Sequence, residues 1–150
     1  MLKKILIGAG VVALVGAVYV RLSPSDISTF HVAPVATVAG DVGGSHSFQA
    51  ARQITAPAAD VLRAVDTVAT STQRTYAVAG SIGEGLVTYQ TRSALMGYPD
   101  YTTVTVMDGP DGPLLVILAQ SRFGQSDLGV NRARVEEWLA RLGPLVVPLG

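Results

Sequence analysis

The first 22 residues constrain this chain more than any other feature, because they hold a long uninterrupted apolar run. Ile5 to Val20 contains no charged side chain, Lys3 and Lys4 precede it, and Arg21 follows it directly. As a helix these 16 residues span about 24 Å, against about 30 Å for the hydrocarbon core of a bilayer. The flanking basic side chains can reach water through the apolar layer and make up the missing length. We therefore predict a transmembrane signal-anchor over residues 1–22, with the bilayer as the partner of Ile5–Val20.

A cleaved secretory signal is the alternative interpretation of this segment. Val15-Gly16-Ala17 has the small residues of a cleavage site, but Tyr19, Val20 and Arg21 directly behind it are untypical of one. We favour the retained anchor. The excess of positive charge before the apolar run favours an N-terminus in the cytoplasm. The sequence then predicts an inner (cytoplasmic) membrane protein whose C-terminal domain lies in the periplasm.

The composition excludes several kinds of site and partner for the part of the chain that we predict to be exported. The chain has no cysteine, which excludes disulfides, thiolate metal sites and cysteine nucleophiles. The part beyond Arg21 has eight arginines, no lysine and all eleven acidic residues, a formal charge of −3. A mildly acidic body without a basic stripe argues against nucleic acid as a partner and against electrostatic docking onto anionic lipid. The two histidines, His31 and His46, have no carboxylate cluster beside them. We predict no metal site and no cofactor.

Residues 23–45 have the composition of a linker, rich in proline and glycine and without sustained periodicity. Two short apolar pieces within it, Phe30–Val32 and Val35–Ala39, are able to pack against the body. The chain then alternates between apolar and polar or small residues from Ser47 to Ile54, which is typical of a half-buried strand. Apolar residues recur at helical spacing between Pro57 and Thr70, which predicts a helix.

The remainder of the chain predicts further strands and one last helix. Short β-branched or aromatic runs separated by glycine-rich turns indicate strands. These are Thr75–Ala79, Leu86–Thr91, Tyr101–Met107 and Leu114–Ala119. Asn131–Leu142 has an amphipathic helical pattern that ends at Gly143-Pro144. The fold class expected is therefore α+β: one N-terminal transmembrane helix, then a small antiparallel sheet with two helices on one face. We expect the globular domain at 46–143 and an apolar tail at 144–150.

The densest polar cluster lies between the last predicted strand and the last predicted helix. It includes Arg122, Ser126, Asp127, Asn131 and Arg132. On one interpretation it is a structural corner, in which Asp127 or Asn131 caps the helix and Arg122 pairs with Asp127. On the other, Arg122, Arg132 and the helix N-terminus form an anion- or partner-binding pocket. We favour the structural interpretation and keep all five residues as binding candidates.

A second cluster joins two predicted strands through an unusually apolar and aromatic loop. Arg92, Tyr98, Asp100 and Tyr101 are its binding candidates, and Leu95 and Met96 lie between them. The loop is a contact surface or pocket rim on one interpretation, and folds onto the sheet on the other. An enzymatic use of Asp100 or Asp127 as acid or base, with Arg92 or Arg122, is the weakest hypothesis. We predict no catalytic residue.

Three segments of the chain form recognisable motifs: Thr91-Arg92-Ser93 with Gly97 to Val104, Ser121 to Val135, and His31-Val32-Ala33-Pro34. Together they resemble an uncharacterised family, the domain of unknown function 1499, in whose motif an acidic residue stands at the position of Ala33. The resemblance implies no established activity. Separately, Ile54-Thr55-Ala56-Pro57 before a helix is similar to the opening of helix-grip lipid-binding domains.

Two functional hypotheses follow. The first is a non-catalytic, membrane-anchored periplasmic interaction module, an accessory subunit of a larger membrane protein complex. It rests on the predicted anchor, the small number of potential catalytic groups, the aromatic loop and the apolar tail. The alternative is a periplasmic domain that binds lipid or another hydrophobic ligand between sheet and helices. The apolar run Leu114–Ala119 and the helix-grip similarity support it.

Overall fold

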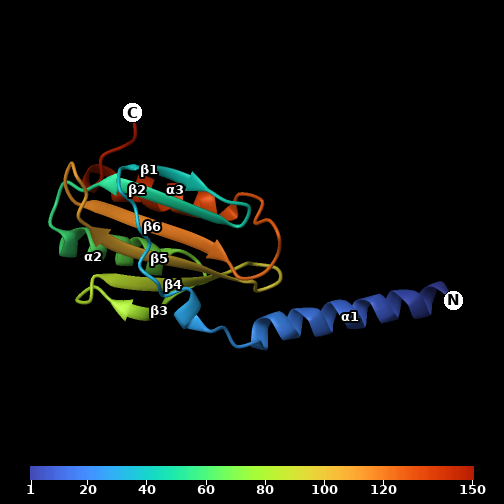
Figure 1. Cartoon of the computed structure of the whole chain (residues 1–150). Coiled ribbons are helices and arrows are strands. Elements are labelled where there is room, and N and C mark those ends of the chain that lie inside the picture. Colours follow the sequence, from blue (N-terminus) through green and yellow to red (C-terminus); the bar gives the residue numbers. More distant parts are fainter.

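The computed structural model describes residues 1–150, and it consists of one helix projecting from a layered body (Figure 1). Helix α1, Leu2–Leu22, is 21 residues long, and only Val20 in it is buried. Its length and apolar composition are sufficient to cross a membrane. A signal sequence near an N-terminus meets the same two criteria.

The body is built on a six-stranded sheet in the order β1-β2-β6-β5-β4-β3, and every neighbouring pair is antiparallel. The strands are β1 Gly40–Gly43, β2 Ser47–Gln53, β3 Thr75–Ser81, β4 Leu86–Arg92, β5 Pro99–Met107 and β6 Leu114–Ser121. Strands β3 to β6 follow one another as hairpins. Successive connections therefore lie at opposite ends of the sheet.

Two helices cover one face of this sheet, α2 Ala58–Ser71 and α3 Val130–Leu142 (Figure 1). A cluster of 17 buried residues fills the space between the two layers. Trp138 of α3 is fully buried and meets Tyr89 of β4 edge to face, with ring centroids 5.7 Å apart. The apolar stripes that predicted both helices face this cluster. The α+β prediction, with the helices on one face, is confirmed.

The segment after α1 crosses the other face of the sheet (Figure 1). Its 3₁₀ turn, Ile27–Thr29, leads to Phe30, which stacks on Tyr101 of β5 at a centroid distance of 4.1 Å. Thr103 donates a hydrogen bond to the Phe30 carbonyl at 2.7 Å, and the His31 ring lies 2.9 Å from the Thr88 hydroxyl. The apolar piece around Phe30 therefore packs against the body, as its composition indicated.

Two segments that the sequence predicted as linker and tail form β-pairing with β2 and its neighbouring residues in the structure. Strand β1 lies within the predicted linker and pairs with β2 from Gly40 to Gly43. Its four residues, Gly-Asp-Val-Gly, carry no apolar alternation, so only the backbone pairing defines the strand. Near the C-terminus, after the 3₁₀ turn Gly143–Leu145, Val146 forms a bridge with Ile54 and is buried.

Candidate functional site

The candidate residues gather mainly at the end of the sheet that lies nearer to α1. We call this the α1-proximal end and define it by two loops, 93–98 between β4 and β5 and 122–129 between β6 and α3. Both loops point to the side on which α1 leaves the body (Figure 1). The opposite end carries the β3–β4 turn and the β5–β6 turn.

Arg122 fastens the segment that follows α1 to this end. Its Nη1 donates to the Ser23 carbonyl at 2.9 Å and to Ser25 Oγ at 2.7 Å. Its Nη2 donates to Ser23 Oγ at 3.0 Å and to the Pro24 carbonyl at 2.8 Å. The predicted pair of Arg122 with Asp127 is wrong, because three consecutive residues of the linker supply four acceptors for the guanidinium. We refer to this contact as the Arg122 clasp.

The N-cap position of α3 is Gly129, and Asp127, two residues before it, accepts hydrogen bonds from free N–H groups at the start of the helix, the function that the structural interpretation of the corner gave it. The two carboxylate oxygens of Asp127 accept hydrogen bonds from the backbone N–H groups of Gly129 and Asn131, each at 3.0 Å. Partial burial by itself would raise the pKa of Asp127, but these hydrogen bonds favour the charged form and lower its pKa overall. Ser126, beside it, accepts from the Leu128 N–H at 3.3 Å.

Asp100 and Asn131 belong to a buried polar network rather than to an open site. Asp100 forms an ion pair with Arg134 at 2.8 Å, and both side chains are about nine-tenths buried. Arg134 also donates to Asn131 Oδ1 at 2.8 Å. Asn131 is fully buried and donates to the His46 carbonyl and to Ser121 Oγ. Arginine is usually placed on the solvent face of an amphipathic helix, but Asp100 on the helix side of β5 draws Arg134 inward.

The remaining candidates are separated. Tyr101 is 1% exposed, because Phe30 covers its ring. Arg132 extends into solvent along α3, where it pairs with Glu136 at 3.0 Å and lies over the Phe48 ring at 4.9 Å. Arg122 and Arg132 therefore take different partners. The structure does not form the pocket that would have joined these two arginines.

Three hollows lie at the α1-proximal end. One of ≈ 290 Å³ lies between the β1–β2 turn and the 122–129 loop, beside Ser126, Asp127 and Arg132, and the other two are larger. The first of these two has a volume of ≈ 330 Å³ and is bordered by four of the candidates, Tyr98, Asp100, Ser126 and Asp127. Apolar side chains also border it: the Phe123 and Tyr98 ring centroids are 6.0 Å apart, and Leu128 is 92% exposed. In the neighbouring loop Leu95 is 84% exposed. Two bulky aliphatic side chains thus project from adjacent loops.

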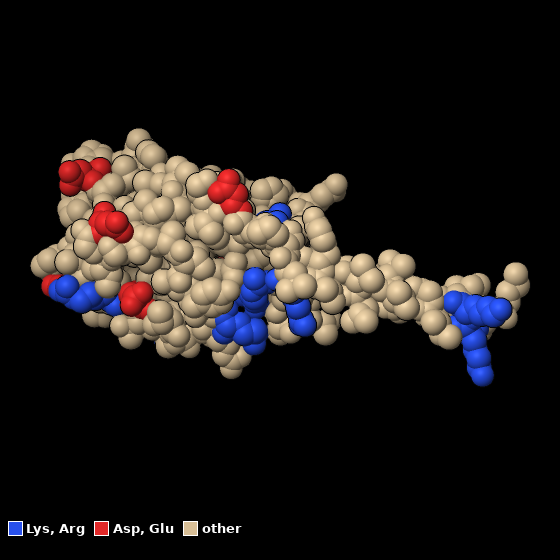
Figure 2. Space-filling model, turned by 90° about the horizontal axis from the view of Figure 1, so that it is seen from below, with Lys and Arg blue, Asp and Glu red and all other residues tan.

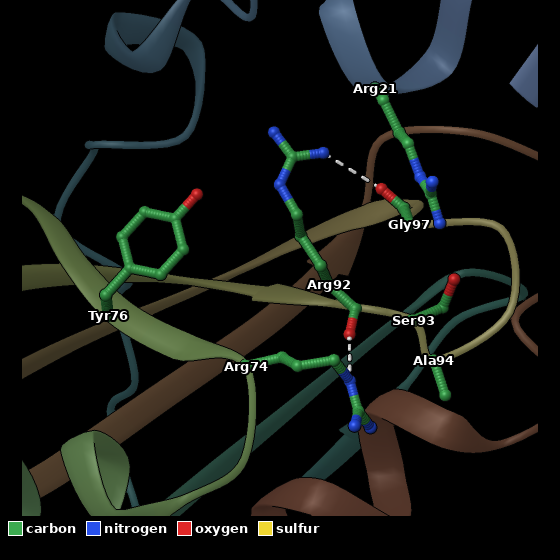
Figure 3. A pocket seen from close by; sticks show the side chains of 7 residues that line it. All are labelled: Arg21, Arg74, Tyr76, Arg92, Ser93, Ala94 and Gly97. Atoms are coloured by element: carbon green, nitrogen blue, oxygen red, sulfur yellow. Dashed lines mark hydrogen bonds between the residues drawn. The ribbon is translucent and has the colours of Figure 1, made fainter. Parts of the chain in front are cut away.

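The second hollow, of ≈ 480 Å³, lies where α1 meets the sheet and contains three arginines (Figure 3). Arg21, Arg74 and Arg92 line it together with Tyr76, Ser93, Ala94 and Gly97. Arg92 Nη1 donates to the Gly97 carbonyl at 2.9 Å. Gly97 has a φ of +70°, and a Cβ there would lie 2.8 Å from Arg21 Nε. A glycine at this position therefore permits Arg21 to approach the loop.

Only Arg92 of this hollow was a candidate from sequence. Arg21 was interpreted as an anchor flank, and Arg74 and Tyr76 were not singled out. Nothing local in the sequence distinguishes them, because Arg21, Arg74 and Arg92 meet only once the sheet and the anchor are assembled. No group of three or more His, Asp or Glu side chains is placed to hold a metal ion.

The fold and these surfaces define an α+β domain that is joined closely to an N-terminal apolar helix. The chain belongs to a family described as proteins of unknown function, DUF1499, which matches residues 23–142 and confirms the resemblance found in the sequence. No curated protein matches the chain.

Solved structures of similar architecture come from three bacteria. A Mesorhizobium loti protein has a TM-score of 0.49 at 12% identity, covering 64% of this chain and 93% of its own. A putative uncharacterised Rhizobium leguminosarum protein has a TM-score of 0.46 at 15% identity, covering 64% and 90%. A Chromobacterium violaceum protein has a TM-score of 0.40 at 16% identity, covering 69% and 99%.

Proposed function

We propose that this protein is a non-catalytic interaction module, held at the periplasmic face of the inner membrane by α1, and an accessory subunit of a membrane protein complex. The observation that carries the proposal is the Arg122 clasp. It engages Ser23, the residue immediately after the helix, so the folded body sits directly at the base of the anchor.

Because of the Arg122 clasp, the segment after α1 is a short, fixed connection, although its composition is that of a flexible linker. A free segment rich in proline and glycine would let the body move away from the bilayer. Here the Arg122 bonds and the stacking of Phe30 on Tyr101 fasten the segment at two places. A domain held in this way presents the same end to the membrane at all times, which suits a subunit that contacts a neighbour within the bilayer or at its surface.

The α1-proximal end offers the contact surface. Leu95 and Leu128 are 84% and 92% exposed, and Tyr98 and Phe123 pack beside each other in the same two loops. Large exposed aliphatic side chains next to aromatic rings are typical of interface centres. Leu128 has a φ of 53°, a backbone conformation that is uncommon for a residue other than glycine. The loop thus holds an apolar side chain outward on an unfavourable backbone.

The alternative function, binding of a lipid or other hydrophobic ligand inside the domain, has less support. The buried cluster with Trp138 and Tyr89 at its centre fills the space between the sheet and the helices. The linker occupies the opposite face of the sheet. A ligand of this kind would have to displace one of these two layers.

Site-specific photo-crosslinking in native membranes tests the proposal. A photoreactive residue is placed at Leu95 or Leu128, and the matched control positions are Glu84 and Asp111 in the turns at the opposite end. We expect discrete crosslinks to a membrane protein from the first two positions and none from the controls. Equal crosslinking from both ends, or crosslinks to lipid alone, would contradict the proposed contact surface.

A further inference from the structure

The three-arginine hollow has the chemistry of a site for one phosphate group. Arg21, Arg74 and Arg92 carry three positive charges, and no acidic residue lines the hollow. The four ion pairs of the structure use other arginines: Arg52, Arg63, Arg132 and Arg134. Figure 2 shows basic side chains gathered where α1 joins the body. The charge of −3 over the body conceals this local excess of positive charge.

The bonds that these arginines make leave donors free. Arg92 uses Nη1 on the Gly97 carbonyl. Arg74 uses Nε on the Arg92 carbonyl at 3.0 Å and Nη1 on Gln73 Oε1 at 3.3 Å. Arg21 makes one long bond of 3.4 Å to the Leu95 carbonyl. Each guanidinium has five N–H donors, so several remain for a ligand. In Figure 3 the Arg21 and Arg92 side chains approach Gly97 from two sides.

A hydroxyl group adds a donor of the right kind. Ser93 Oγ accepts a hydrogen bond from the Tyr98 N–H at 3.0 Å, which fixes the oxygen and leaves its proton free to donate. Two guanidinium forks and a serine hydroxyl around an open hollow match the oxygens of a phosphate group. The arginines are accessible: Arg92 is half-buried, and Arg21 and Arg74 are exposed.

The position of Arg21 indicates where the phosphate comes from. Arg21 lies in the last turn of the apolar helix, and in a spanning helix this turn reaches the level of the lipid headgroups. We propose that the hollow binds the phosphate of one phospholipid headgroup. The source of the phosphate, though not the arginine chemistry, rests on the proposed membrane anchoring. Such a site holds a single headgroup and differs from broad electrostatic adsorption of the body.

The test uses the full-length chain in micelles of a maltoside detergent, which contains no phosphate. Calorimetric titrations use three soluble probes: dihexanoyl phosphatidylglycerol, dihexanoyl glycerol without the phosphate, and inorganic phosphate. The variants are Arg21→Gln and Arg92→Gln. Arg63→Gln on α2 is the control, because it removes the same charge from an exposed helix surface. Circular dichroism checks that each variant is folded, and Arg21→Gln leaves every hydrogen bond within the sheet intact.

We expect phosphatidylglycerol to bind the wild type and the control equally, and each site variant at least tenfold more weakly. Dihexanoyl glycerol should not compete. Binding of inorganic phosphate without phosphatidylglycerol would overturn the lipid source. Equal binding by all variants, or no binding of either phosphate compound, would overturn the site itself. These results do not depend on whether a partner protein exists, so they can fail separately from the proposed function.

Discussion

Arg122 and Ser23 lie 99 positions apart in sequence, yet the guanidinium of the first donates hydrogen bonds to both the carbonyl and the hydroxyl of the second. Ser23 caps the C-terminal end of α1 through a backbone N–H bond to Tyr19, so the contact joins the loop after the last strand to the end of α1. The body and α1 are coupled by side-chain chemistry as well as by chain connection.

Replacement of Arg122 with glutamine should release the segment behind the anchor without unfolding the body. Four hydrogen bonds to Ser23–Ser25 are lost, while the stacking of Phe30 on Tyr101 remains. Amide hydrogen exchange of Thr29, Phe30 and His31, whose N–H groups are bonded within the 3₁₀ turn, should accelerate about tenfold, equivalent to about 1.4 kcal/mol of local stability.

The matched control for the clasp is Arg132→Gln, which removes an exposed arginine of α3 bonded to Glu136. It should leave the exchange of the 3₁₀ turn unchanged. If both variants exchanged at the wild-type rate, the Arg122 clasp would not hold the segment.

Asp100→Ala should lower the free energy of unfolding by about 3 kcal/mol, because it leaves Arg134 buried without its carboxylate. Chemical denaturation followed by Trp138 fluorescence measures the loss. The double variant Asp100→Leu, Arg134→Met removes both charges and should recover part of it. A double variant less stable than the single one would show that the loss does not arise from leaving the Arg134 charge unpaired.

Asp127→Ala should lower the free energy of unfolding by about 1 kcal/mol at pH 7, since it removes the carboxylate that accepts hydrogen bonds at the start of α3. Because the folded state lowers the pKa of Asp127, its contribution is present above the ordinary value of 3.8 and is lost as pH falls through the lower folded pKa. Urea denaturation at several pH values should show wild type and variant converging below pH 3.8. Asp111→Ala, in the β5–β6 turn, is the control and should show no comparable convergence.

Tyr89→Phe tests how the stability of the fold depends on pH in alkaline solution. Burial, and then the hydrogen bond to the Asp66 carboxylate at 2.9 Å, raise the pKa of Tyr89 well above its ordinary value of 10.0. The neutral phenol therefore stabilises the fold fully below pH 10.0, and this contribution declines as pH rises above it. At pH 8 the variant should be less stable by about 1 kcal/mol.

Between pH 9 and 11 the wild type should lose more stability than Tyr89→Phe. Tyr98→Phe, which alters a half-exposed ring, should keep the wild-type dependence on pH. Parallel curves for the wild type and Tyr89→Phe would show that the buried phenol does not control alkaline stability.

Local patterns predicted most of the body. Apolar spacing indicated α2 and α3, alternation indicated β2, and the polar residues after β6 indicated that Asp127 accepts hydrogen bonds at the start of α3. The misses are contacts between distant segments. Arg122 pairs with Ser23 rather than with Asp127, and Arg134 turns inward to Asp100. Strand β1 has no apolar pattern of its own, because it is an edge strand held by its backbone. No local signal brings Arg21, Arg74 and Arg92 to one hollow.

Whether the protein is a membrane-anchored subunit can be tested by isolating a C-terminally tagged chain from native membranes in a mild detergent and measuring its intact mass together with the proteins that accompany it. We expect the full-length chain, with residues 1–22 retained, in a stoichiometric complex with a membrane protein. A chain shortened at its N-terminus and found alone in the soluble fraction would rule out the proposed function.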